Sequence, residues 1–418
     1  MKLKSYFPNK GYDVLFLCVY LILFIYAVFR VINVDLVNGW TDMCVQDHLF
    51  NFGGGFIRRG LGGEIIFFVQ DYLHISPLIF INLLSGLSYI ALSYILIRLF
   101  LKRGYALNVL ILSFALGGVL VYNFSLFRRD FLEVLLFGLI VILYKRMAFK
   151  PWIAVGNLTM IFGILLHEAT FFFSIPLLIL ITNLKLNSII KSTAWWMPSI
   201  IAFLICCVFK GSPESLPALL DRAAAHAPEA FEDGNTPYLL GFIGNKASEA
   251  FRIHIMMNFV FPVRIFSLPI PSLVFAVFYY LYIPYMTIAM IMGFTKRKTD
   301  QGAMSNLLKV IVIQFVCLLP MWIVLSCDYG RVSFYWITSS LLVWLSLKDN
   351  EIPDMFTAKY NHLINNLFSK IFTRWLPSKP ILTVLALCIG VVFCGQSLVG
   401  MFTSSLIHKL YIVVTQII

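Results

Sequence analysis

The chain has few charged residues: Asp, Glu, Lys and Arg together make up 12% of its 418 positions. Ordinary soluble domains carry about twice that share, so this scarcity of charge excludes a soluble globular protein. The chain is hydrophobic at 60% of its positions, and its mean hydropathy is +0.87. This composition predicts an all-α, polytopic membrane protein whose helices cross a hydrocarbon core of about 30 Å.

Acidic residues are scarcer than basic ones, with 20 Asp and Glu against 32 Lys and Arg, and the formal net charge is +12. An excess of this size can indicate a polyanionic partner. Here most of the basic residues lie in short loops that alternate along the chain, as in the cytoplasmic loops of membrane proteins. We therefore expect no nucleic-acid partner.

The sequence also lacks the spacings that mark disulfide frameworks and metal sites. Its eight Cys lie mostly inside apolar runs, without CxxC or Cys/His spacing, and packing is their expected role. A disulfide between Cys44 and Cys327 stays open as an alternative if both face outward. Because no cluster of metal ligands stands out, we expect neither a metal nor a cofactor.

Apolar runs of about 17 to 25 residues recur along the whole length, as membrane-spanning helices require. The basic residues near the N-terminus place it in the cytoplasm, and the alternation of basic loops then predicts about 11 transmembrane helices (10–12) in one integral membrane domain, residues 1–418. We expect these helices at about residues 13–33, 77–103, 106–123, 130–145, 151–166, 169–182, 194–209, 270–294, 305–326, 332–347 and 380–402.

Three loops of this predicted topology are long enough to matter for function. The first outer loop, residues 34–75, ends in an interfacial or re-entrant helix that starts near Gly62. The second, residues 211–267, contains the alanine-rich segment LPALLDRAAAHAPEAF, which predicts short amphipathic helices. The third, residues 349–379, is cytoplasmic and carries mixed charge.

The first outer loop contains the glycine-rich stretch NFGGGFIRRGLGGE, from Asn51 to Glu64. Glycine lets the backbone take positive φ and approach a ligand closely, and the guanidinium groups of Arg58 and Arg59 can bind phosphate oxygens in pairs. These features favour an anion site. The alternative is a flexible loop whose arginines anchor at lipid headgroups.

Two neighbouring apolar segments, residues 151–166 and 169–182, are separated only by His167 and Glu168. A helix of about 15 residues spans roughly 22 Å, less than the hydrocarbon core. We therefore expect this ionisable pair to lie below the outer surface, where such groups are costly and often functional. The alternative is one long broken helix with a satisfied polar pair.

The predicted topology places most of the polar residues that could carry chemistry at or just below the outer face. They are Asp42, Asp47, Arg58, Arg59, Arg128, Arg129, Asp130, His167, Glu168, Asp328 and Arg331. Together they could hold a diphosphate and offer a carboxylate or an imidazole as a base. Taken singly, pairs such as Arg129 and Asp130 are equally well explained as structural salt bridges at helix ends.

Three segments resemble a known family: RRDFLEVLLFGLIVIL, LLHEATFFFSIPLLILI and YGRVSFYWITSSLLVW. They are similar to helices of the Wzy/EpsG-type polymerases of O-antigen and exopolysaccharide, which are related to the GT-C membrane glycosyltransferases. The resemblance implies a GT-C-like enzyme of the bacterial inner (plasma) membrane, with interfacial helices on the periplasmic side. Its expected partners are undecaprenyl-diphosphate-linked glycans, membrane lipids and a polysaccharide chain-length regulator.

The expected reaction transfers a glycan from the lipid diphosphate to a second lipid-linked repeat unit, as in lipopolysaccharide synthesis. The leaving diphosphate needs positive charge, for which the candidates are Arg58, Arg59, Arg128, Arg129 and Arg331. The acceptor hydroxyl needs a proton acceptor, for which His167 and Glu168 come first and Asp42 or Asp130 next. We expect this chemistry to be independent of metal.

Two other functions fit the same sequence features. A GT-C glycosyltransferase that uses a polyprenyl-monophosphate sugar donor would share the outward-facing site. A transporter or flippase of lipid-linked oligosaccharide would also carry ionisable residues inside the membrane. The cytoplasmic loops, however, show only the orienting Lys and Arg, which favours an enzyme with its site on the outer side.

Overall fold

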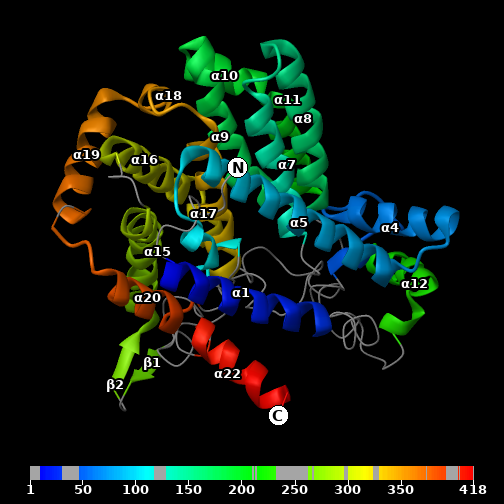
Figure 1. The fold of residues 1–418 in the computed structure, drawn as a ribbon. Coiled ribbons are helices and arrows are strands. Elements are labelled where there is room, and N and C mark those ends of the chain that lie inside the picture. The colour runs from blue at the N-terminus through cyan, green and yellow to red at the C-terminus, as the bar shows by residue number, and fades with distance from the viewer. Residues whose placement is uncertain are drawn as a thin grey trace. The chain divides into compact units, whose positions relative to one another are not determined.

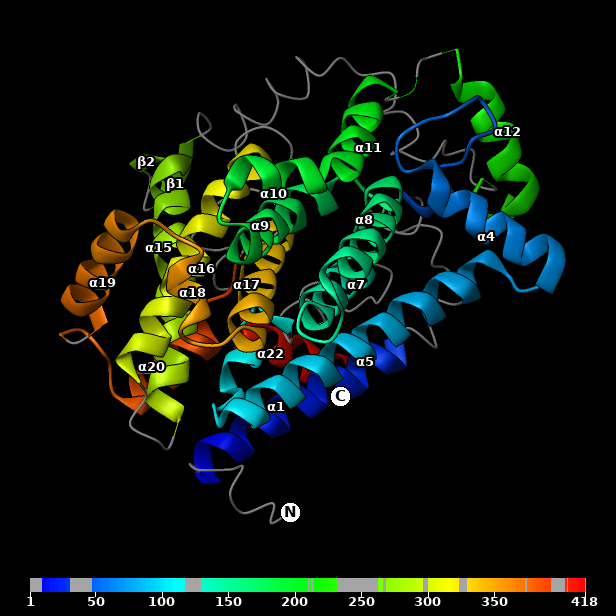
Figure 2. The same ribbon diagram turned by 90° about the horizontal axis from the view of Figure 1, so that it is seen from above.

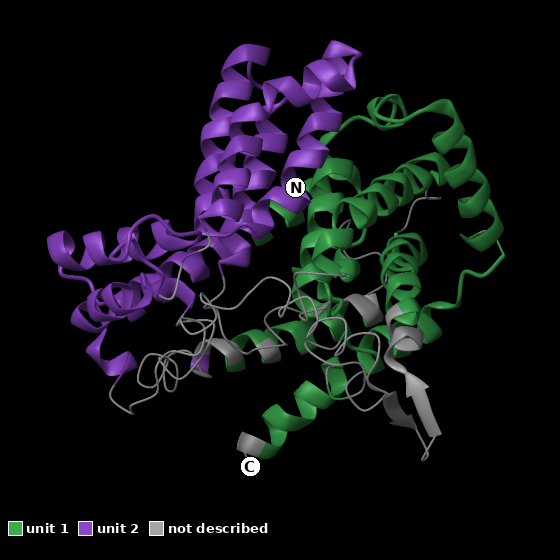
Figure 3. Cartoon of the chain, turned by 180° about the vertical axis from the view of Figure 1, so that it is seen from behind, with its two compact units in different colours: residues 1–28, 93–124, 251–418 green, residues 29–92, 125–250 purple. Residues whose placement is uncertain are grey.

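The structure is a computed structural model, and Figure 1 labels its elements. It describes residues 10–30, 47–116, 129–209, 211, 214–231, 262–265, 268–295, 300–322, 329–372, 374–391, 403 and 405–417. These residues belong to two compact units, coloured green and purple in Figure 3. Unit 1 contains residues 1–28, 93–124 and 251–418, and unit 2 contains residues 29–92 and 125–250.

Unit 2 is helical in its described residues. Its elements are η4 (Asp47–Leu49), α4 (Gly60–Leu73), the first part of α5 (Pro77–Arg103), α7 (Asp130–Leu143), α8 (Phe149–Leu166), α9 (Ala169–Leu186), α10 (Ile189–Trp195), α11 (Met197–Val208), α12 (Leu216–His226) and η6 (Pro228–Ala230). Helices α7, α8, α9 and α11 pack against one another, and Figure 2 shows α7, α8 and α11 side by side.

Buried tryptophans and an asparagine fix this packing. Trp196 is fully buried and donates its indole N–H to Thr182 Oγ1 at 2.8 Å, and Gly156 of α8 leaves room for its ring. Asn157 Oδ1 accepts from Ser199 Oγ at 2.8 Å, which ties α8 to α11. Because these buried polar groups have partners, the bundle buries them at little cost.

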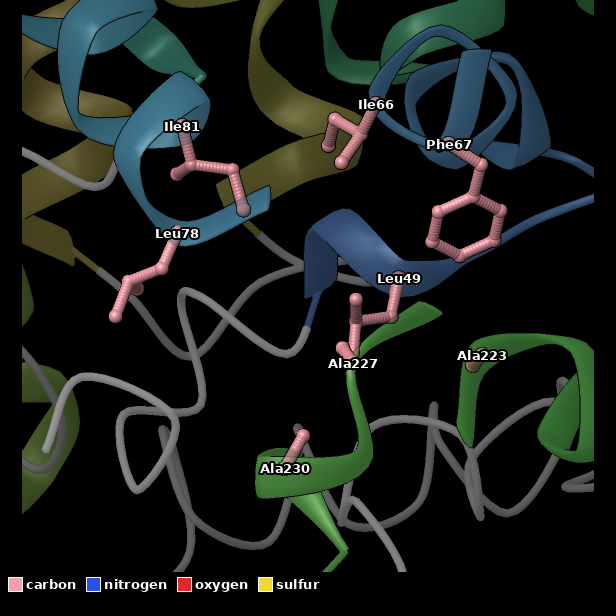
Figure 4. Packing of buried hydrophobic residues seen from close by; sticks show 8 residues of the cluster. All are labelled: Leu49, Ile66, Phe67, Leu78, Ile81, Ala223, Ala227 and Ala230. Atoms are coloured by element: carbon pink, nitrogen blue, oxygen red, sulfur yellow. The ribbon is translucent and has the colours of Figure 1, made fainter. Parts of the chain in front are cut away.

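The short helices predicted in the second outer loop are present as α12 and η6. Their alanines Ala223, Ala227 and Ala230 pack against Leu49, Ile66, Phe67, Leu78 and Ile81, as Figure 4 shows. Alanine allows a close approach of α12 to α4 and α5, and each buried Leu, Ile or Phe adds about 1.5–3 kcal/mol. This cluster therefore holds α12 beside the glycine-rich stretch.

Unit 1 is also mainly helical in its described residues. Its elements are α1 (Lys10–Arg30), the end of α5, η5 (Leu107–Ile111), β1 (Pro262–Ile265), β2 (Leu268–Pro271), α15 (Ser272–Phe294), α16 (Gln301–Cys317), α17 (Tyr329–Ser346), α18 (Glu351–Asp354), α19 (Ala358–Phe372), α20 (Lys379–Cys388) and α22 (Leu406–Ile417). Strands β1 and β2 pair antiparallel, with Pro262 opposite Pro271 and Ile265 opposite Leu268.

Helices α16 and α17 form the centre of unit 1. The indole N–H of Trp336 donates to the Ile311 carbonyl at 2.7 Å, and that of Trp344 donates to the Ala303 carbonyl at 2.9 Å. Arg103 at the end of α5 binds Asp349 Oδ1 and Oδ2, both at 3.1 Å, just after the end of α17. Large rings with satisfied N–H groups thus fill the space between the two helices.

The prediction of a helical protein is confirmed, but a count of about 11 spans is not reached in the described residues. Among those residues, four helices are long and apolar enough to cross a membrane: α5, α8, α9 and the part of α15 from Val277 to Phe294. Helices α10 and α11, bent by 65°, make a fifth span if taken together.

Some described helices are shorter than a bilayer requires. Helices α7 and α20 have 14 and 10 residues, and the expected helix at 106–123 begins as the five-residue η5. Residues 117–123 and 392–402 of the expected spans lie outside the described residues. Apolar composition alone could not show these ends, because buried helices and membrane spans share it. By contrast, α8 and α9 each have 18 residues, because Phe149, Lys150 and residues 183–186 extend them.

Helices α8 and α9 are therefore about 27 Å long, close to the thickness of the hydrocarbon core. The expectation that they are too short to span the membrane was wrong. His167 and Glu168 lie at the ends of two nearly full-length helices.

Candidate functional site

The glycine-rich stretch is tightly packed in the structure. A Cβ on Gly63 would lie 2.1 Å from the Phe50 carbonyl oxygen, and one on Gly54 would lie 2.2 Å from the Ser215 carbonyl oxygen. Both distances are impossible for any residue with a side chain. Of the glycines in this stretch, Gly55 alone has a positive φ, at 103°. The glycines thus serve close backbone packing, and the alternative of a flexible loop is not supported.

Arg59 is held where this stretch meets α4. Its backbone adopts the left-handed conformation, with φ 66°, immediately before the helix begins at Gly60. A residue with a side chain rarely takes this conformation, and the surrounding contacts must maintain it. The Gly63 N–H donates to the Phe50 carbonyl at 3.0 Å, and the Phe52 N–H donates to Glu64 Oε1 at 2.7 Å. These bonds fix the direction in which the Arg59 side chain leaves the backbone.

The guanidinium group of Arg59 binds two carboxylates. Its Nε and Nη2 donate to Glu168 Oε2 and Oε1 at 2.8 and 2.5 Å, and its Nη1 donates to Asp47 Oδ1 at 3.1 Å. The paired contact with Glu168 is the geometry in which Arg binds a carboxylate most strongly. Arg59 therefore links the first predicted outer loop to the break between α8 and α9.

Arg58 lies beside this ion pair but is held more loosely. Its Nη1 is 3.5 Å from Glu168 Oε1, and its side chain is 39% exposed, against 15% for Glu168. Its backbone N–H donates to the Phe209 carbonyl at 2.9 Å, at the end of α11. The backbone is thus fixed while the guanidinium group stays accessible.

Glu168 is the carboxylate that both arginines share. Burial acts to raise its pKa, but the charges of Arg59, His167 and Arg58 and the hydrogen bonds from Arg59 outweigh burial. The pKa of Glu168 therefore lies well below its ordinary value of 4.5. A carboxylate of such low basicity is suited to holding the arginines and is a weak proton acceptor.

Arg129 is buried and bound to the backbone. Its Nη1 donates to the Leu166 carbonyl at 2.6 Å, its Nη2 to the Asp47 carbonyl, and its Nε to His48 Nδ1 at 3.2 Å. It thus binds a terminal carbonyl of α8 and holds η4 in place. With these acceptors in place, Arg129 positions Asp47 and is not open to a ligand.

His167 occupies the one extended residue between α8 and α9, with φ −162° and ψ 123°. Its Nδ1 accepts a hydrogen bond from the Ala169 N–H at 3.1 Å, and its side chain is buried. This bond fixes the orientation of the imidazole ring between the two helices. Asp130 is fully buried in the first turn of α7.

A cavity of about 160 Å³ lies next to Arg129 and His48. Its lining is mostly apolar and comes from α4, α5, α7 and α8, and it includes Gly62, Phe80, Leu132, Phe162 and Leu166. A space of this size and lining holds an apolar group and not a diphosphate. An anion would meet the protein at the exposed Arg58 instead.

Not every predicted site residue can be placed. Asp42, Arg128 and Asp328 lie outside the described residues, as do Cys44 and Cys327 of the alternative disulfide. Arg331 belongs to unit 1, where its guanidinium carbon lies 5.9 Å from the centre of the Tyr335 ring. The structure thus brings together Asp47, Arg58, Arg59, Arg129, His167 and Glu168, all in unit 2.

A second polar group, which the sequence did not reveal, holds α12 against α4. Glu64 Oε2 accepts from Arg222 Nη2 at 2.6 Å, and His226 Nε2 is 3.4 Å from Asp71. The Phe67 ring stacks on His226 with centroids 4.2 Å apart. The only sequence signal was the spacing of Arg222 and His226, four residues apart on one face of a helix.

The site is thus a cluster of ion pairs with one accessible arginine, beside a break between two long apolar helices. Its geometry suits the binding of an anionic group that competes with Glu168 for Arg58. In comparisons of the whole chain, no family model, no curated protein and no solved structure matches it.

Proposed function

We propose that this protein is a membrane glycosyltransferase that polymerises undecaprenyl-diphosphate-linked oligosaccharides into O-antigen or a related surface polysaccharide. The reaction would take place at the outer face of the inner membrane. The observation that carries the proposal is the half-exposed Arg58 beside the bound pair of Arg59 and Glu168. The resemblance of three helices to the Wzy/EpsG-type polymerases supplies the substrate class.

In this proposal Arg58 binds the diphosphate of the donor lipid. When the glycosidic bond to the carrier breaks, negative charge builds up on the leaving diphosphate, and a fixed guanidinium group stabilises it more in the transition state than in the ground state. Arg58 can leave Glu168 at little cost because their contact is long and partly exposed. Glu168 keeps Arg59 in place during this exchange.

The roles of the other residues follow from their hydrogen bonds. His167 is fixed by the hydrogen bond that its Nδ1 accepts from the Ala169 N–H, and it stays in the proposal as a residue that orients the acceptor. Glu168 and Asp47 hold Arg59, and Glu168 is not assigned as the base, because a carboxylate whose pKa lies well below its ordinary value accepts a proton poorly. Arg128 and Arg331 stay in the proposal as predicted contacts with the diphosphate, and Asp42 or Asp130 as the predicted acceptor of the proton that the attacking hydroxyl group loses.

The proposal extends to the fold and the location. It includes a GT-C-like arrangement of about 11 spans, with the N-terminus in the cytoplasm and interfacial helices on the periplasmic side. Helix α4 would be such an interfacial helix, since it is apolar, has 14 residues and follows the arginine pair directly.

The test compares Arg58→Ala with Arg98→Ala in cells that need this protein for polymer synthesis. Arg98 is a matched control because it is exposed and bonds only to Tyr94 among the described residues. Loss of one transition-state donor lowers the rate by roughly 10²–10³-fold, so Arg58→Ala should leave single repeat units in place of a ladder. Both variants should insert into the membrane at wild-type levels.

Purified protein in liposomes then separates the proposal from its two alternatives. With a lipid-diphosphate-linked repeat unit, we expect product that grows as a ladder. Growth by one sugar from a polyprenyl-monophosphate donor would favour the alternative GT-C enzyme. Accumulation of lipid-linked repeat units at the inner face of the membrane in cells that lack the protein would favour a flippase. Synthesis of a full polymer ladder by Arg58→Ala would refute the assignment of Arg58 to the site.

A further inference from the structure

Unit 1 contains an apolar groove far larger than the cavity beside Arg129. Its volume is about 730 Å³, within the range of about 300–1,000 Å³ that is typical of ligand pockets. It is lined by side chains of α15, α16, α17, α19 and α20, among them Tyr285, Val312, Phe315, Leu367 and Ile371. This lining suits a hydrocarbon chain.

Helix α19 brings basic residues to this groove. Leu363, Leu367, Lys370 and Arg374 recur three or four residues apart, so they follow one face of the helix and the turn after it. Leu367 and Ile371 line the groove, and each has a basic residue three positions further on. The apolar part of this face thus passes directly into a basic part.

These two basic residues are free to bind an anion. Lys370 and Arg374 are exposed, and in the part of the chain that the structure describes neither is paired with a carboxylate. An ammonium and a guanidinium group four positions apart in the sequence match the phosphate of a lipid headgroup. The neighbouring Trp375 is 73% exposed, and such a ring is typical of segments at the headgroup level.

The end of α19 is also fixed relative to the groove. The Tyr285 hydroxyl donates to the Trp375 carbonyl, and the Tyr285 ring stacks on Phe372 with centroids 5.5 Å apart. Phe368 and Phe372 of α19 are buried, and Phe372 also lines the groove. The basic residues are therefore held at a constant distance from the groove lining.

From the groove and this basic end, we propose that unit 1 binds one anionic glycerophospholipid. One acyl chain occupies the groove, and the phosphate of the headgroup contacts Lys370 and Arg374. The predicted cytoplasmic position of residues 349–379 places this lipid in the inner leaflet, where anionic headgroups attract basic segments. The lipid site belongs to unit 1 and does not depend on the reaction proposed for unit 2.

The test is native mass spectrometry of the purified full-length protein with phosphatidylglycerol or phosphatidylcholine added at equal concentration. We expect one phosphatidylglycerol to be retained in preference to phosphatidylcholine. Each basic side chain near an anionic headgroup contributes roughly fivefold in affinity, so Lys370→Gln/Arg374→Gln should weaken this binding about 25-fold. The control is Lys359→Gln, which removes one positive charge about 16 Å from Lys370 on the same helix and should leave this binding unchanged.

A second pair of variants tests the groove itself. Leu367→Trp fills the groove from a half-exposed position and should abolish retention of phosphatidylglycerol, whereas Leu363→Trp lies one turn away, outside the lining, and should not. Equal retention of the two lipids, or wild-type retention by Leu367→Trp or by the double glutamine variant, would overturn the proposal. Complete displacement of phosphatidylglycerol by undecaprenyl diphosphate would do the same, because the groove would then belong to the substrate.

Discussion

The substitution Glu168→Gln tests whether one carboxylate holds the arginine pair. It removes the charge and keeps the volume, so Arg59 loses its paired contact and Arg58 loses its contact at 3.5 Å. Removing one partner of a buried pair costs about 3–5 kcal/mol, and an exposed pair contributes about 0–1 kcal/mol. Glu168 and Arg59 are 15% and 21% exposed, and Arg59 keeps Asp47. We therefore expect a loss of about 2–3 kcal/mol.

Thermal unfolding of the purified protein in detergent measures this loss. For a domain of about 150–250 residues each kcal/mol lowers Tm by about 2–4 °C, so Glu168→Gln should lower it by about 4–12 °C. The control is Asp349→Asn, which breaks the pair of Arg103 with a carboxylate that is 44% exposed. It should lower Tm by no more than about 4 °C, because this pair is screened by water.

A double-mutant cycle with Arg59→Gln decides the cause of the loss. If Glu168 and Arg59 stabilise the protein by their mutual ion pair, the double variant should be only slightly less stable than the less stable single variant. The interaction free energy from the cycle should then be about 2 kcal/mol. A Glu168→Gln protein that melts within about 2 °C of the wild type, or single losses that simply add, would refute the ion-pair account.

Three further predictions follow from the same structure. The pKa of Glu168 is lowered on folding, so its ion pairs stabilise the protein fully above pH 4.5 and less as the pH falls below that value. The difference in Tm between the wild type and Glu168→Gln should therefore shrink on acidification, and a difference that stays constant with pH would contradict this prediction. Gly63→Ala should lower the free energy of unfolding, measured in urea, by about 3 kcal/mol, because the added methyl group would clash with the Phe50 carbonyl oxygen. Gly11→Ala, in open space on a helix, should raise it by up to about 1 kcal/mol, and equal effects of the two substitutions would exclude the packing role of Gly63. Arg222→Gln removes the hydrogen bond to Glu64 and should speed proteolysis in α12 several-fold, whereas Asp221→Asn on the same turn should not. An unchanged cleavage rate in Arg222→Gln would mean that the apolar cluster alone holds α12.

The sequence was sufficient to place the long apolar helices, although it did not predict α19 within residues 349–379. Long apolar runs gave the positions of α5, α8, α9 and α15 to within a few residues, because a helix in a membrane must satisfy its backbone internally. The alanine-rich segment also predicted α12 correctly, since its apolar residues recur with helical spacing. The break at His167 was visible as the single polar interruption between two apolar runs.

Helix lengths and side-chain partners could not be obtained in this way. A buried helix and a membrane span have the same apolar composition, so α7 and α20 were expected to be longer than they are. The two adjacent arginines looked equivalent, yet Arg59 is bound by two carboxylates and Arg58 is half exposed. That difference accompanies the left-handed backbone of Arg59, whose side chain reaches both Asp47 and Glu168, while Arg58 makes one longer contact with Glu168.

The sequence by itself determined that this chain is helical, with several segments long and apolar enough to cross a membrane, and that its ionisable residues are few and gathered at a few positions. Only the tertiary structure decided which of them meet, because the contact of Arg59 with Glu168 joins residues 109 positions apart. Such a contact depends on the packing of α4 against α8, which the order of residues along the sequence does not predict. The same packing buries Arg129 against backbone carbonyls and leaves Arg58 accessible.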